Sequence, residues 1–173
     1  MKKTSFEAIA RVLNQANVPF LVVGGIAVIH HGYGRATKDV DLVVRLEKEA
    51  ILRAFRALES IGYRPAVPIT AEQFADPAQR ESWRTDKGMK VLKFWSDAHR
   101  ETPLDIFVSE PFDFPKEFEA ATIRESTPGV PVHIISLAAL LAMKREAGRP
   151  QDLADIDELN LLHDNPSSYD REN

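Results

Sequence analysis

The sequence predicts an α+β domain: a short mixed β-sheet flanked by helices, with two helices at its C-terminal end. Apolar runs that are too short for helices recur along the chain, separated by turn signals, and they indicate strands. Amphipathic stripes at helical spacing gather toward both ends of the chain. The chain has 173 residues, which is long enough for one hydrophobic core. We therefore assign residues 1–164 to a single domain and residues 165–173 to a polar tail.

The composition is that of a soluble globular protein, with 44% hydrophobic and 28% charged residues. The net charge of -4 gives no global argument for nucleic-acid binding. The absence of cysteine excludes disulfides, thiolate zinc sites and cysteine nucleophiles, and it is compatible with a reducing cytoplasm. The N-terminal segment has the pattern of an amphipathic helix rather than a signal peptide, and no stretch approaches the roughly 20 apolar residues of a membrane span. We expect a cytoplasmic protein without a membrane partner.

Four segments are expected in the first third of the chain. Phe20–Val23 is a continuous apolar run that predicts a buried strand, and a short helix follows over Ile26–His31. Thr37–Val44 predicts a second strand. An apolar stripe over Glu47–Ile61 predicts a helix that ends at Gly62. A helix before these segments has one apolar face made of four residues at helical spacing: Phe6, Ile9, Ala10 and Leu13.

The middle of the chain is predicted to be mainly strands. Tyr63–Val67 is a short strand, and the polar stretch Thr70–Thr85 has room for one helical turn around Ala71–Phe74. Met89–Trp95 and Pro103–Val108 predict two strands joined by a hairpin turn. The second of these two strands is of functional interest, because it carries a single carboxylate, that of Asp105, among apolar residues.

The last third of the chain is predicted to form two strands and then two helices. Ala120–Glu125 and Val130–Ile134 flank a turn signal and predict the strands. Ser136 is placed to cap a helix over Leu137–Ala147. Pro150 stands where a last helix begins.

Three aspartates are the candidate metal ligands. Asp39 and Asp41 are two residues apart on the second strand, so both point to one face of the sheet. Carboxylates side by side repel each other unless a cation lies between them. If the strand that carries Asp105 lies beside this strand, three hard oxygen ligands converge, which suits Mg²⁺ or Mn²⁺. The alternative for each of them is structural: a polar strand edge, or a salt-bridged aspartate.

A glycine pair and several basic residues are the candidate phosphate ligands. Gly24-Gly25, followed by a short helix, fits phosphate held by backbone amides. The pattern is neither a dinucleotide fingerprint nor a Walker A loop. Four basic residues are candidates for a triphosphate clamp, although each could equally be a surface residue: Arg35, Lys38, Lys144 and Arg149.

Two further patterns remain open at this stage. Asp152 is explained most simply as a cap of the last helix, while Asp155 could hold Lys144 or Arg149 in place. The segment from Trp83 to Trp95 is locally basic with aromatic residues, which is typical of a nucleic-acid surface. A solvated strand face is the preferred interpretation of that segment, given the net charge of -4.

These residues, in this order, resemble the nucleotidyltransferase superfamily of the DNA polymerase β type. The front motif is Gly24-Gly25, then Arg35, Thr37 and Asp39-x-Asp41, with Asp105 on a later strand. Within the superfamily the chain resembles minimal bacterial members related to AbiEii-type toxins, and it is also similar to aminoglycoside nucleotidyltransferases. The segment from Ser136 to Ile156 resembles a helical segment of the toxin-like proteins, so the resemblance spans nearly the whole chain.

The resemblance implies Mg²⁺-dependent transfer of a nucleoside monophosphate from an NTP, ATP among them, to an acceptor hydroxyl. By position, Asp39, Asp41 and Asp105 would bind the metals, and Asp105 would also help to deprotonate the acceptor. The remaining site residues would bind the nucleotide: Gly24, Gly25, Arg35, Thr37, Lys144 and Arg149. The acceptor stays open between an RNA end, a protein and a small molecule. A non-catalytic nucleotide-binding module, or a protein-partner module such as half of a toxin–antitoxin pair, is the alternative.

Overall fold

The computed structural model describes residues 1–164, and the expected tail at 165–173 lies outside the described residues. Helices and strands are mixed along the chain, in this order: α1 (Lys3–Gln15), β1 (Phe20–Val22), α2 (Gly24–His30), β2 (Val40–Val44), α3 (Lys48–Ser60), β3 (Arg64–Pro65), α4 (Ala71–Ala75), α5 (Pro77–Lys87), β4 (Val91–Trp95), β5 (Leu104–Phe107), α6 (Phe114–Ala120), β6 (Thr122–Thr127), β7 (Val130–Ile134), α7 (Leu137–Ala147) and α8 (Pro150–Asp164). The predicted α+β class is confirmed.

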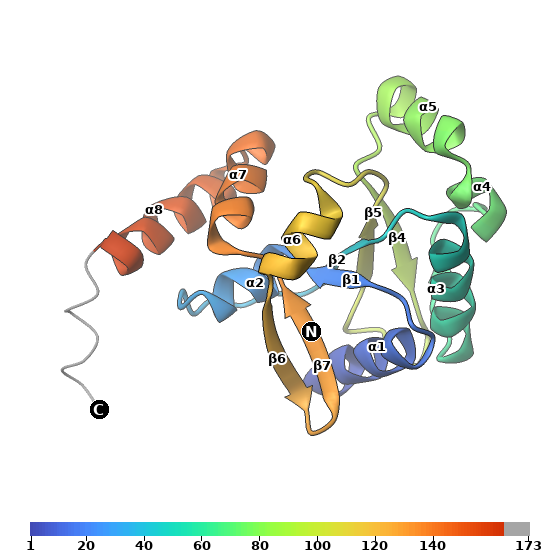
Figure 1. Cartoon of the computed structure of the whole chain (residues 1–173), viewed down its shortest axis with the longest axis horizontal. Coiled ribbons are helices and arrows are strands. Elements are labelled where there is room, and N and C mark those ends of the chain that lie inside the picture. Colours follow the sequence, from blue (N-terminus) through green and yellow to red (C-terminus); the bar gives the residue numbers. More distant parts are fainter. Residues whose placement is uncertain (165–173) are drawn as a thin grey trace.

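One mixed sheet of seven strands runs through the molecule in the order β3-β4-β5-β2-β1-β7-β6 (Figure 1). β2 is antiparallel to β1 and parallel to β5, and β1 is parallel to β7. β1 is a fully buried apolar run, as the sequence predicts for a strand covered on both faces, whereas β2 and β5 each carry one aspartate among mostly buried apolar residues. In Figure 1, α7 and α8 lie on the opposite side of the molecule from α3, α4 and α5.

The helices follow the predicted apolar stripes. All four predicted residues of the first helix are buried in α1. Ser136 caps α7 by accepting a hydrogen bond from the Ala139 amide, and Gly148 ends that helix with a left-handed backbone. The two predicted C-terminal helices, α7 and α8, follow the last strand. Within the described residues, no helix is long and apolar enough to cross a membrane.

The segment 70–85 holds more helix than predicted: α4 confirms the helical turn around Ala71–Phe74, but the second helix, α5, was not predicted. Thr70 forms a capping box with Gln73 at the start of α4, and Asp76 caps α5 with Pro77 in its first turn. In α5 the single buried apolar residue is Trp83, so the helix shows almost no stripe in the sequence. The two helices are therefore defined by their caps more than by a continuous apolar face.

Candidate active site

Two of the predicted carboxylates are direct neighbours in the sheet. β2 and β5 pair in parallel with Asp41 opposite Asp105, so the condition set by the sequence is met. Asp39 comes immediately before β2 rather than within it, a correction to the predicted strand over Thr37–Val44. One carboxylate oxygen from each of the three aspartates lies within 4.8 Å of the others. Asp105 is the most deeply buried of the three, with 6% of its surface exposed.

The three carboxylates concentrate negative charge at a site that is partly shielded from solvent. Burial raises the pKa of Asp41 to about 6, with further contributions from the charges of Asp39 and Asp105. A hydrogen bond from the Gly25 backbone and the charge of Arg149 oppose this rise in the pKa of Asp41. Burial also raises the pKa of Asp105. A set of carboxylate oxygens with surplus negative charge fits a hard divalent cation, so the donor chemistry agrees with Mg²⁺ or Mn²⁺.

A lysine that the sequence reasoning missed contacts the cluster. Lys93 lies opposite Asp105 in the antiparallel pairing of β4 and β5. Its Nζ donates to both carboxylate oxygens of Asp105, at 2.8 and 3.1 Å. This contact lowers the pKa of Asp105 and raises the pKa of Lys93. The predicted hairpin contained the information needed to find this contact, because aligning its two strands would have placed Lys93 beside Asp105. The salt-bridged alternative for Asp105 is thus realised together with the cluster.

The glycine pair packs directly against the carboxylates. α2 begins at Gly24, which has a left-handed backbone with φ of +60°. A Cβ at Gly24 would lie 2.6 Å from Asp41 Cγ, and a Cβ at Gly25 would lie 2.8 Å from Thr37 Cβ. Both positions therefore require glycine for close approach. The predicted short helix starts two residues earlier than expected, at the edge of the site.

Three of the predicted basic residues belong to one ion-pair network. Lys144 is buried and donates to Asp155 at 2.6 Å and to Asp152 at 3.1 Å. Arg149 contacts Asp152 at 2.6 Å, and Arg35 contacts Asp155 at 2.8 Å. Asp155 thus holds Lys144, one of the two partners foreseen, and Asp152 is a charge partner rather than only a cap. The Lys144 ammonium is already engaged by two carboxylates, whereas the side chain of Arg149 is 76% exposed.

A cavity of about 620 Å³ opens between the carboxylates and the two C-terminal helices. Of the predicted site residues, it is lined by Gly24, Asp41, Asp105, Lys144 and Arg149, but not by Gly25, Arg35, Thr37 or Asp39. Its other lining residues include an apolar group: Val91, Phe107, Leu140 and Met143.

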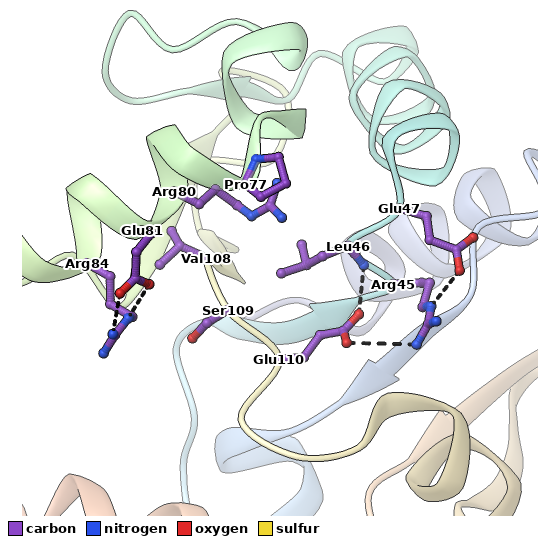
Figure 2. Close-up of a pocket in the computed structure, with 10 residues that line it drawn as sticks. All are labelled: Arg45, Leu46, Glu47, Pro77, Arg80, Glu81, Arg84, Val108, Ser109 and Glu110. Atoms are coloured by element: carbon purple, nitrogen blue, oxygen red, sulfur yellow. Dashed lines mark hydrogen bonds and ion pairs between the residues drawn. The ribbon is translucent and has the colours of Figure 1, made fainter.

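A smaller cavity of about 350 Å³ adjoins the first and shares Arg84, Ser109 and Glu110 with it. Figure 2 shows that its acids are already engaged: Glu81 with Arg84, and Glu110 with Arg45 and the Leu46 amide. The lining of this smaller cavity contains none of the predicted site residues.

The comparisons with known proteins agree with this geometry. A family described as "Nucleotidyltransferase of unknown function (DUF6036)" matches residues 3–165. A search of curated protein sequences finds no match.

Three solved structures share the fold. A provisionally assigned nucleotidyltransferase from Thermotoga maritima has 14% identity over 90% of this chain and 89% of its own, with a TM-score of 0.53. The enzyme ANT(2″)-Ia, solved with adenylyl-2″-tobramycin, has 15% identity over 92% and 87%, with a TM-score of 0.55. An antigenic nucleotidyltransferase-like protein from Paracoccidioides brasiliensis has 19% identity over 92% and 75%, with a TM-score of 0.56. At these identities the likeness is one of fold.

Proposed function

The chain belongs to the DUF6036 family of nucleotidyltransferases, and on this premise we propose that it transfers a nucleoside monophosphate from an NTP to an acceptor hydroxyl. One observation carries the proposal. Three carboxylates each offer an oxygen within 4.8 Å of the others, and two of them, Asp41 and Asp105, line a cavity of about 620 Å³. That cavity also presents the exposed cation Arg149. We propose that residues 1–164 act as the single catalytic domain.

The metal ligands in this proposal are Asp39, Asp41 and Asp105. Mg²⁺ or Mn²⁺ bound there supplies positive charge that neutralises the triphosphate and the attacking oxygen. The raised pKa values of Asp41 and Asp105 support this role, because burial, and to a smaller extent the neighbouring carboxylates, disfavours the charged forms in the absence of a cation.

The reaction is a displacement at the α-phosphorus. The acceptor oxygen forms a new bond to this phosphorus, the bond to the β-phosphate bridge breaks, and pyrophosphate leaves with the electron pair. The hydroxyl proton passes to a carboxylate oxygen of Asp105. Asp105 suits the transfer because burial raises its pKa, which makes it a better proton acceptor than an ordinary aspartate.

The nucleotide-binding residues divide into two groups by position. Arg149 and Gly24 line the cavity, so we assign them direct contact with the triphosphate. Lys144 also lines it, but its contact with the nucleotide requires exchange of one of its two aspartate partners. Arg35 and Thr37, both against Gly25, act by holding the glycine turn in place.

Label transfer tests the proposal. The protein is incubated with Mg²⁺, α-labelled NTPs and either total RNA or a cell lysate, and labelled products are separated by size and chemistry. We expect a labelled product with the natural protein and with Asp157→Asn, an exposed aspartate on α8. We expect none with Asp41→Asn or Asp105→Asn. NTP binding without transfer would instead support the non-catalytic alternative, and absence of both would refute the proposal.

A further inference from the structure

One strip of the sheet next to the carboxylates is left open to solvent. Along β4, exposed and buried residues alternate, and Lys93 and Trp95 share the exposed face. Lys93 contacts Asp105, so this face is the one that carries the candidate metal ligands. Trp95 is 50% exposed, whereas Trp83, the other tryptophan of the segment, is buried. Of the two tryptophans in this basic segment, Trp95 is therefore the one that faces solvent, and it does so on the same face of the sheet as the carboxylates.

A third cavity, of about 230 Å³, lies beside Trp95 at the turn that follows β4. It is lined by Trp95, Ser96, Asp97, His99, Arg100 and Pro103. The charged members are engaged, because Arg100 pairs with Asp97 at 3.0 Å.

The other polar members of this turn cavity differ in their partners. His99 contacts the Ser5 hydroxyl at 2.9 Å and stacks on Tyr63. Ser96 is 2% exposed, and its hydroxyl has no hydrogen-bond partner within residues 1–164. The cavity thus offers an exposed indole and a proline ring, while the Ser96 hydroxyl is buried against Gly62.

The turn cavity lies one step along the sheet from the reacting centre. Phe94 is opposite Leu104, so the same register brings Trp95 beside Pro103. Trp95 is two residues from Lys93, and Pro103 is two residues from Asp105, which is about 7 Å along each strand. If the aromatic ring of a ligand stacked on the Trp95 indole, a hydroxyl attached close to that ring would therefore lie within reach of the Asp105 carboxylate. A ribonucleoside has this layout, with its ribose hydroxyls next to its base.

Resting on the proposed function, we propose that the turn cavity is the acceptor subsite, which holds a nucleobase stacked on Trp95. The acceptor is a ribonucleoside, free or at the end of a single-stranded RNA. Its ribose hydroxyl replaces the Lys93 ammonium at Asp105, which is sterically simple because the Lys93 side chain is 62% exposed. Lys93 and the exposed Arg64 beside Trp95 also disfavour a polycationic acceptor on this face.

Equilibrium binding tests the subsite without any need for catalysis. A short 5′-fluorescein-labelled oligoadenylate is titrated with protein in EDTA, without NTP, and followed by fluorescence anisotropy. We expect Trp95→Ala to weaken binding by roughly 5- to 150-fold, the range for loss of one stacked base, and Trp95→Phe to recover most of it. The matched control is Ile123→Ala, an equally exposed apolar residue on the edge strand β6, which should bind as the natural protein does.

Competition experiments distinguish a free nucleoside from an RNA end as the source of the stacked base. Displacement of the labelled oligonucleotide by adenosine supports a nucleoside acceptor, and displacement only by unlabelled oligonucleotide supports an RNA end. Displacement by tobramycin alone would overturn the proposal, as would absence of oligonucleotide binding or equal binding by Trp95→Ala. Asp41→Asn separates this proposal from the proposed function. It should bind the oligonucleotide while failing to transfer label, so lost transfer with retained binding leaves the subsite standing.

Discussion

Replacing Asp41 by asparagine should stabilise the metal-free protein while removing its activity. The pKa of this carboxyl in the folded protein is about 6, against 3.8 for the free group. The folded state therefore resists ionisation of Asp41 by about 2 pKa units, which corresponds to about 3 kcal/mol. Asparagine has nearly the same shape and can still accept the hydrogen bond from Gly25, but it carries no charge. It should release most of that cost.

The pH dependence of stability follows from the direction of the pKa shift of Asp41. Below about pH 3 the carboxyl is largely protonated in both states, so Asp41 costs the folded protein almost nothing. As pH rises toward 6 the unfolded chain ionises first, and the stability of the metal-free protein falls. The cost is complete above about pH 6. The difference between Asp41→Asn and the natural protein should therefore be near zero at about pH 3 and approach about 3 kcal/mol at about pH 8.

Urea denaturation in EDTA at several pH values measures this difference. Asp157→Asn removes an exposed carboxylate and should follow the natural protein at every pH. Saturating Mg²⁺ should stabilise the natural protein more than Asp41→Asn and narrow the gap, because a ligand of the folded state adds stability by mass action. The reasoning is refuted if Asp41→Asn is no more stable than the natural protein at about pH 8 in EDTA, or if the gap persists unchanged at about pH 3.

Three other predictions concern neighbouring residues. Gly24→Ala should lose transfer and Mg²⁺ binding because its Cβ would overlap the adjacent carboxylate; Gly88→Ala has nearly the same φ with open space around it and should show only a modest loss of thermal stability. Lys93→Met removes the contact that lowers the pKa of Asp105, so that pKa should rise in a carbon-13 NMR titration and the acidic limb of the transfer–pH profile should move to higher pH; an unmoved titration would contradict the assignment. Lys144→Met leaves two buried aspartates short of a cation and should cost about 3–5 kcal/mol in urea denaturation, whereas the exposed Lys116→Met should cost little; equal stabilities would show that the pair is not needed.

The local elements and the site's chemical character could be predicted from the sequence, because they depend on short-range patterns. The spacing of Asp39 and Asp41 and the lone carboxylate in the strand of Asp105 were enough to suggest a metal centre. The pairing of these two strands had to be assumed, because Asp41 and Asp105, which face each other in the sheet, are separated by 63 residues of sequence. Strand pairings of this range leave no local mark in a single sequence.

The partners of the basic residues were the least predictable part of the site. Arg35 and Asp155 are 120 positions apart, and nothing near either residue signals the other. Lys144 was expected to point at a triphosphate, because a lysine on an apolar helix face is conspicuous when its partners cannot be seen. The helix α5 was missed for a related reason: it depends on its Asp76 cap and one buried apolar anchor, Trp83, rather than on a repeating pattern.

The ion-pair network limits how this protein can be rebuilt. Its acids come from α8, whereas its cations come from α7, from the junction of these two helices and from the loop before β2. Exchange of the two C-terminal helices for those of another nucleotidyltransferase would leave Arg35 facing a surface without its carboxylate. A working chimera must bring an acid to the position of Asp155. The sheet that carries the three aspartates and the two C-terminal helices must therefore be exchanged together, and specificity is easier to redesign at the open edge of β4 than by exchanging helices.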